Sequence, residues 1–183
     1  MAAVVSHALA GTAIAALLRP ERRPPLRYWV AAAVIATIPD ADILLVWSGA
    51  AYRGMWGHRG VTHSLAFALV ASALAAFALF SSTPRRTRFS IWVVLFLAGA
   101  SHGFLDAAMA SGAGVAAFAP FSPARLHLPW RPIRVSPPTE NRLLNFGGLR
   151  FTASEVLWIW VPSLVAWLVG TIGRRRSRET PAT

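Results

Sequence analysis

The chain has 183 residues, enough for one domain, and only 14% of them are charged, where a soluble domain has about 25%. It contains no cysteine, which excludes disulfides and thiolate metal sites. Its net charge of +11 is carried by arginines that lie in short clusters between apolar runs, without a basic stripe in polar, foldable sequence. We therefore expect no nucleic-acid partner and interpret the arginines as flanks of membrane spans.

Apolar segments dominate the chain, at about residues 2–18, 28–48, 61–80, 90–110 and 152–172. Each has about 17–21 residues, close to the ~20 that a helix needs to cross a bilayer. The first has no positive side chain ahead of it, which favours a retained helix over a signal peptide. The sequence predicts an all-α integral membrane bundle of about five transmembrane helices. It forms one domain over 1–173, followed by a basic disordered tail over 174–183.

The segment 111–151, between the fourth and fifth apolar segments, is rich in Gly, Pro and Arg and predicts a long ordered loop. With five crossings, 19–27, 81–89 and the tail carry four, three and four arginines on one side of the membrane. The other side has two, Arg53 and Arg59, and five more in the long loop. Because cytoplasmic loops are usually richer in arginine, we expect the N-terminus and the long loop on the outer side of the membrane.

The histidines and aspartates fall at one level on this topology. At 1.5 Å per helical residue, those in or beside the spans lie within about 12 Å of the outer boundary. A carboxylate inside a span costs about 2.5–3.5 kcal/mol at mid-depth, so such residues persist when they pair with something. We expect one shared site, held by arginines, other polar groups or a metal ion. Its candidates are His7, Asp40, Asp42, His58, His63, His102 and Asp106.

Two motifs carry the carboxylates. In "SHGFLD", His102 and Asp106 are four residues apart and project from one helix face, which suits an imidazole and a carboxylate that grip one cation. In "IPDAD", the carboxylates of Asp40 and Asp42 are two apart and would point in different directions on a regular helix. If Pro39 breaks the helix, one carboxylate ligates while the other caps a helix or binds a second ion. The simpler alternative is an N-cap at the break.

The motif "HRGVTHS" joins the second and third spans. Gly60 allows a tight bend, Thr62 or Ser64 can cap the third helix, and His63 then lies at a helix start facing the second and fourth spans. His58 is either a ligand or an interfacial histidine. Arg59 either binds an anionic substrate or anchors the chain at the headgroup level.

Two histidines stand apart from these motifs. His7 is followed one turn later by Gly11, which allows close helix packing, and it is either a ligand or a lone buried polar residue. We interpret His127 as a solvated loop residue.

Imidazole and carboxylate donors without sulfur suit Zn²⁺, Mn²⁺ or Fe²⁺, with zinc preferred. The set is large enough for one or two ions, and two would suit phosphoester cleavage.

The chain resembles the YdjM-like membrane-bound metal-dependent hydrolases of bacterial inner membranes. The resemblance covers "SHALAG", "IPDADIL", "GHRGVTHSL", "SHGFLDAAMASGAGVAAFAPFS", "LPWRPIRVSP" and "SEVLWIWVP". It implies an α-helical membrane protein whose metal site is formed by the seven His and Asp residues above. The His/Asp pattern is also similar to zinc-dependent phospholipase C and S1/P1-type nucleases, by analogy only. The chain has "DAAMASGAG" where relatives often have "DALT", so no hydroxyl role is expected there.

Two functions follow. The first is a metal-dependent hydrolase, a phosphoesterase acting on a lipid or lipid-linked substrate near the outer face. In it Asp40, His63, His102 and Asp106 hold metal. Asp42 or His58 acts as general base or second-metal ligand, and Arg59 or Arg53 steadies the anionic group. The second is a non-catalytic membrane protein with a structural metal site, or a metal-binding or transport module. Transport would favour polar residues at several depths.

Overall fold

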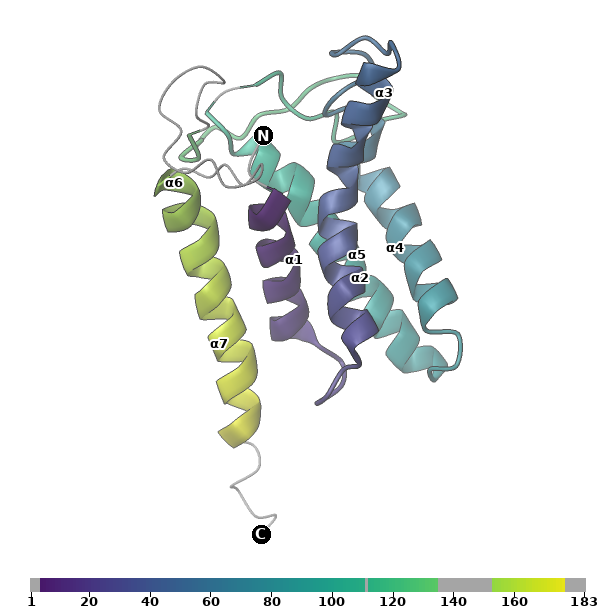
Figure 1. The fold of residues 1–183 in the computed structure, drawn as a ribbon, viewed down its shortest axis with the longest axis vertical. Coiled ribbons are helices and arrows are strands. Elements are labelled where there is room, and N and C mark those ends of the chain that lie inside the picture. The colour runs from purple at the N-terminus through teal and green to yellow at the C-terminus, as the bar shows by residue number, and fades with distance from the viewer. Residues whose placement is uncertain (1–3, 111, 135–152, 177–183) are drawn as a thin grey trace.

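The computed structural model describes residues 4–110, 112–134 and 153–176, which form five helical columns that run side by side (Figure 1). The first is α1 (Val4–Leu18), and the second joins α2 (Leu26–Thr37), the 3₁₀ turn η1 (Ile38–Asp42) and α3 (Ile43–Trp47). The 3₁₀ turn η2 (Val61–His63) precedes the third, α4 (Leu65–Leu79), and the fourth is α5 (Arg85–Ala107). The fifth joins α6 (Ala153–Glu155), the π-helical η3 (Val156–Trp160) and α7 (Val161–Arg176).

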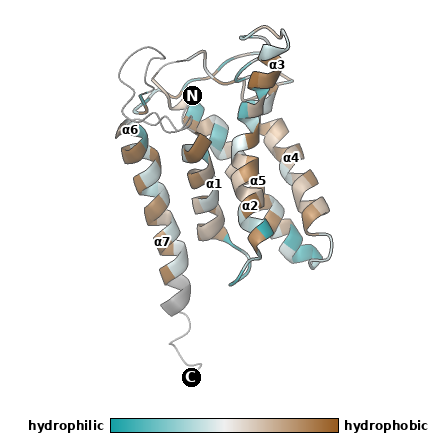
Figure 2. Ribbon diagram, viewed as in Figure 1, coloured by the Kyte–Doolittle hydropathy of each residue, from teal (hydrophilic) through white to brown (hydrophobic). Residues whose placement is uncertain are grey.

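The columns match the five predicted apolar segments, and the all-α membrane bundle is confirmed. Three are long and apolar enough to cross a membrane: Leu26–Trp47, Arg85–Ala107 and Ala153–Ile172. Helices α1 and α4 have 15 residues each and would extend about 22 Å, short of a bilayer core of about 30 Å. Hydrophilic residues gather toward the two ends of the bundle (Figure 2). Large apolar side chains such as Val30, Leu74 and Leu168 are exposed on the helix faces, as expected for contact with lipid.

Small residues let the helices approach one another. Helix α1 packs against α2, α5 and α7, and α4 packs against α5. At Gly11 a Cβ atom would collide with the Cβ of Ala36 on α2, so the predicted role of this glycine in close packing is confirmed. Buried alanines such as Ala15 and Ala32 continue the contact. Lipid is as apolar as the interior of the bundle, so such close packing is a main source of helix association.

Two prolines lie where a span departs from regular α-helix, and the first of them is Pro39, the helix break considered from the sequence. Pro39 lies in η1, where the helix tightens from α to 3₁₀ for five residues. Pro162 is the second residue after the π-helical η3. A proline has no N–H to give the preceding turn, and local 3₁₀ or π geometry is a known accommodation in membrane helices. The interruption at Pro39 positions part of the candidate site, because η1 contains both aspartates of "IPDAD".

The described part of the predicted long loop, 112–134, folds over one end of the bundle (Figure 1). Isolated β-bridges join Met109 to Ile133 and Val115 to Leu126, and the described residues contain no regular strand. Residues 135–152 lie outside the described residues. Helix α7 includes the first three residues of the predicted tail, and 177–183 also lie outside the described part.

Candidate metal centre

The seven predicted site residues converge at the end of the bundle that the 112–134 segment covers. They come from α1, η1, the turn that ends in η2, and α5, and the exposed fraction of each residue is between 0% and 7%: His7, Asp40, Asp42, His58, His63, His102 and Asp106. Two side-chain groups with metal-ligand spacing form within this cluster, and His63 belongs to both.

The first group contains Asp40, His63, His102 and Asp106, whose ligand atoms all lie within 4.8 Å of one another. The Nε2 atoms of His63 and His102 are 3.0 Å apart, and each lies 3.5–3.6 Å from Oδ1 of Asp40. Oδ2 of Asp106 is 3.4 Å from Nε2 of His63. A tetrahedral ion with bonds of about 2.0–2.1 Å places its ligand atoms about 3.3–3.4 Å apart. Four of the six separations between these ligand atoms are therefore close to the edges of a zinc-type coordination shell, and the other two are within 4.8 Å.

Each of the two histidines is oriented by an acceptor that its Nδ1 atom contacts, on the side of the ring away from the other ligands. Nδ1 of His102 lies 2.8 Å from the carbonyl oxygen of Ala36, and Nδ1 of His63 lies 3.1 Å from Oδ2 of Asp42. These acceptors fix the proton on Nδ1, so both Nε2 lone pairs face the centre of the group. Two lone pairs 3.0 Å apart repel one another unless a proton or a metal ion lies between them. The arrangement thus suits cation binding.

The carboxylates point to the same conclusion. Both oxygens of Asp40 are buried without a hydrogen-bond partner in the described part of the chain. Those of Asp106 accept no hydrogen bond of good geometry there either, although Nε of Arg59 lies 2.9 Å from Oδ2 as an ion pair. A buried carboxylate without donors is costly, and coordination of a metal removes that cost. The chemistry of the donor set therefore fits a divalent ion.

His7 lies at the edge of this group. Its ring stacks on that of His102 with centroids 3.8 Å apart, and its Nε2 is 3.7 Å from Oδ1 of Asp106. Neither of its ring nitrogens has a hydrogen-bond partner among the described residues. His7 belongs to neither group with metal-ligand spacing, so both roles given to it, a ligand and a lone buried polar residue, stay predictions.

The second group contains Asp42, His58 and His63. Oδ1 of Asp42 is 2.9 Å from Nδ1 of His58, and Oδ2 accepts from the backbone N–H of Arg59 and the hydroxyl of Thr62, both at 3.0 Å. Binding a second ion here would need both ring nitrogens of His63 as ligands and would displace these donors from Asp42. The geometry favours a single ion, with Asp42 behind His63 as its orienting carboxylate.

Arg59 points into the protein. It is 3% exposed and its guanidinium contacts Asp106 and the sulfur of Met109. Its φ of 62° is left-handed, which costs a non-glycine residue about 1–2 kcal/mol, and its backbone bonds to Asp42 and Ala116 hold it there. The predicted bend thus has its left-handed residue at Arg59, while at Gly60 a Cβ atom would collide with the carbonyl of Met55.

Comparison with known proteins agrees with this architecture. A family model described as YdjM inner membrane protein matches residues 1–177. The chain is similar to Inner membrane protein YbcI of Escherichia coli (strain K12), at 35% identity over 176 residues, which is 96% of this chain and 99% of that relative. The chain belongs to the YdjM inner membrane protein family. No solved structure matches it. This YdjM-family protein is therefore a bacterial inner membrane protein. Neither match describes an activity.

Three further residues support the site in this YdjM-family protein, and the sequence interpretation gave none of them that role. Thr62 binds Asp42, while the predicted helix cap is provided by Ser64, whose Oγ accepts from the N–H of Phe67. Glu155 is 1% exposed and accepts from Ser6, the neighbour of His7, at 2.7 Å. A carboxylate near the N-terminal end of the fifth apolar segment was the available signal for Glu155.

Arg125 is the third of these supporting residues, and it lies in the 112–134 segment that covers the site end of the bundle. Its guanidinium donates to the carbonyl oxygens of Arg53, Gly54, His58 and Gly114, at 3.1–3.2 Å. These hydrogen bonds therefore connect the "HRGVTHS" turn to the 112–134 segment. Burial lowers the pKa of Arg125, and the nearby charges of Arg53 and Arg59 lower it further. A single loop arginine gives no sequence signal for this role. His127 lies apart from the cluster, with Nε2 3.3 Å from the carbonyl of Gly112.

Proposed function

We propose that the protein is a multi-pass inner membrane hydrolase that uses one zinc-type ion to cleave a phosphoester in a lipid or lipid-linked substrate. The observation that carries this proposal is the group of Asp40, His63, His102 and Asp106, in which four of the six separations between ligand atoms, 3.0–3.6 Å, are close to the edges of a tetrahedral shell. Two imidazoles and two carboxylates favour zinc, with Mn²⁺ or Fe²⁺ as alternatives. A bound ion of this type lowers the pKa of water and polarises a phosphoryl oxygen.

The side of access is the Asp40 side. The Asp40 side chain is 6% exposed, whereas the side chains of His63, His102 and Asp106 are all 0% exposed. Water and substrate therefore reach the centre past Asp40. A hydrolase needs one coordination position for water or substrate, while a structural site fills every position with protein. Asp40, which has no hydrogen-bond donor among the described residues, is the ligand most free to move aside.

His58 is the best candidate for general base. Asp42 holds its Nδ1 at 2.9 Å, and its Nε2 is buried without a partner among the described residues. A carboxylate that orients one imidazole nitrogen and leaves the other to accept a proton is the arrangement of general-base histidines. The His58 ring packs edge-on against that of His63, with centroids 5.5 Å apart, so the base adjoins a predicted metal ligand.

The substrate would arrive from the lipid. Exposed aromatic side chains surround the site end of the second column and the turn after it, including Trp47, Tyr52 and Trp56. Tryptophan and tyrosine are enriched where membrane and water meet. The site is therefore at headgroup depth, where the phosphate of a lipid lies. The arginine distribution supports the extracytoplasmic side for this end.

The proposal is tested with a phosphoesterase screen on detergent-purified protein, using phospholipids and lipid pyrophosphates, with the metal chelated and then restored. We expect turnover that depends on metal and that His58→Asn abolishes while metal content is unchanged. Asparagine keeps a donor toward Asp42 and removes Nε2. His127→Asn, in the covering segment, is the matched control and should retain activity.

The competing function is a structural metal site, which the burial of all four ligands would also suit. Under that alternative His58→Asn has no turnover to lose. If no ester is cleaved under any metal and every coordination position is filled by protein, the hydrolase proposal should be abandoned.

A further inference from the structure

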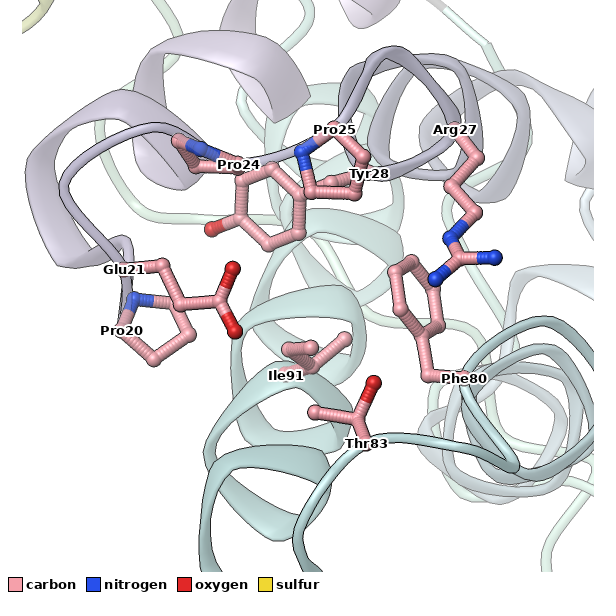
Figure 3. Close-up of a pocket in the computed structure, with 9 residues that line it drawn as sticks. All are labelled: Pro20, Glu21, Pro24, Pro25, Arg27, Tyr28, Phe80, Thr83 and Ile91. Carbon is pink, nitrogen blue, oxygen red and sulfur yellow. The ribbon is translucent and has the colours of Figure 1, made fainter.

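A pocket lies at the opposite end of the bundle from the metal centre, between the α1–α2 connection and the α4–α5 turn (Figure 3). Its walls come from the segment before α2, the first turn of α2, and the start of α5. This is the arginine-rich end, where residues 19–27 and 81–89 carry seven arginines between them. In an inner membrane protein this end lies at a lipid headgroup region, whichever way the chain is oriented.

The pocket contains one carboxylate and one guanidinium. Glu21 and Arg27 lie on different sides of it, with Ile91 and Thr83 between them in the view of Figure 3. Arg27 is exposed, and its guanidinium carbon lies 5.2 Å from the ring centroid of Phe80, which restrains it. Within the described part of the chain, neither Glu21 nor Arg27 forms an ion pair or a side-chain hydrogen bond. Both charges therefore remain available to a ligand.

The pocket floor is apolar and rigid. Tyr28, Phe80 and Ile91 are 1–3% exposed, and the Tyr28 hydroxyl is anchored on the carbonyl oxygen of Ala15 at 2.9 Å. Leu26 and Val30 continue from the pocket along the outer face of α2, and they are 77% and 51% exposed. An acyl chain can follow this exposed face, whereas a soluble ligand would leave it uncovered.

We propose that this pocket binds the zwitterionic headgroup of an aminophospholipid, with its ammonium at Glu21 and its phosphate at Arg27. A ligand that is only anionic would meet the Glu21 carboxylate, and a ligand that is only cationic would meet Arg27 and its neighbours. A headgroup with both charges pairs with both side chains. Phosphatidylethanolamine has this chemistry, with N–H donors for the carboxylate.

The test is native mass spectrometry of full-length protein in detergent, titrated with phosphatidylethanolamine or phosphatidylglycerol of identical acyl chains. Glu21→Gln should weaken phosphatidylethanolamine binding about fivefold, the effect of a partly exposed ion pair worth about 1 kcal/mol, and should not weaken the binding of the anionic phosphatidylglycerol. Arg27→Gln should weaken both, because both lipids carry the phosphate. Arg86→Gln, an exposed arginine that does not line the pocket, is the control.

Three outcomes overturn the proposal. The first is unchanged phosphatidylethanolamine binding in Glu21→Gln. The second is an equal loss of both lipids in that variant, which would indicate diffuse attraction. The third is complete displacement of the bound lipid by equimolar soluble phosphoethanolamine, which would exclude a lipid as the ligand. We expect the lipid to stay bound. Because the pocket lies at the other end of the bundle, none of these outcomes depends on hydrolysis at the metal centre.

Discussion

Replacing Asp42 with asparagine tests whether its carboxylate orients the predicted metal ligand His63 and is not itself a metal ligand. Its carboxylate lies against four donor groups at 2.9–3.1 Å: His58 Nδ1, the Arg59 N–H, the Thr62 hydroxyl and His63 Nδ1. Oδ1 makes one of these contacts and Oδ2 makes three, so an amide, which keeps one acceptor oxygen, loses at least one of them. At about 1.5–3 kcal/mol for each hydrogen bond to a charged group, we expect a loss of about 1.5 kcal/mol or more of folding stability.

Metal affinity should fall with it. A carboxylate that orients a ligating histidine typically accounts for about 10- to 100-fold in affinity, or about 1.4–2.7 kcal/mol. The affinity is measured by chelator competition on protein shown to be folded by thermal unfolding in detergent. Thr62→Val removes one donor and keeps the Asp42 charge, so its affinity should stay within about tenfold of wild type.

Wild-type affinity in Asp42→Asn would refute the orienting role. So would a halved metal stoichiometry, because it would make Asp42 a direct ligand of a second ion. The single-ion geometry would then give way to the dinuclear alternative that the sequence left open.

The other predictions address the ligands, a buried glutamate and the orientation. His102→Ala and Asp106→Ala should each lose bound metal, measured by elemental analysis of folded protein, and full retention in both would remove them from the site. Glu155→Gln should lower the unfolding free energy by about 1–3 kcal/mol, because a buried charged hydrogen bond is weakened; an unchanged melting temperature would contradict this. A cysteine at position 122 should react with a membrane-impermeant reagent in intact cells, and one at Ser81 should not; the reverse pattern would invert the predicted orientation.

The helices could be predicted because apolar length alone sets a membrane span. The boundaries agree within a few residues, and the largest difference is at α5, which begins at Arg85 and not near residue 90. The arginines of its first turn are too polar for an apolar segment, yet they continue the helix into the headgroup region. Membrane helices extend beyond their apolar part in this way, so hydropathy alone underestimates them.

The site was predictable only where local geometry decides it. The four-residue spacing of His102 and Asp106 placed both on one helix face, and the divergence of Asp40 and Asp42 followed from their two-residue spacing. The left-handed backbone of Arg59 could not be predicted from an Arg-Gly pair, in which glycine was the expected residue for the bend. Arg125 was also inaccessible, because its partners lie up to 72 residues away in the chain.

The predicted metal centre also joins the bundle together. Asp40 comes from the second column, His63 from the start of the third, and His102 and Asp106 from the fourth, while His7 of the first stacks on His102. Each of these side chains would be costly to bury alone, and one divalent ion can satisfy all of them. The fifth column contributes no ligand among the described residues, and the Glu155–Ser6 hydrogen bond joins it to α1 one residue before His7. Metal removal should therefore loosen the site ends of the first four columns together, while the contact between α1 and the fifth persists.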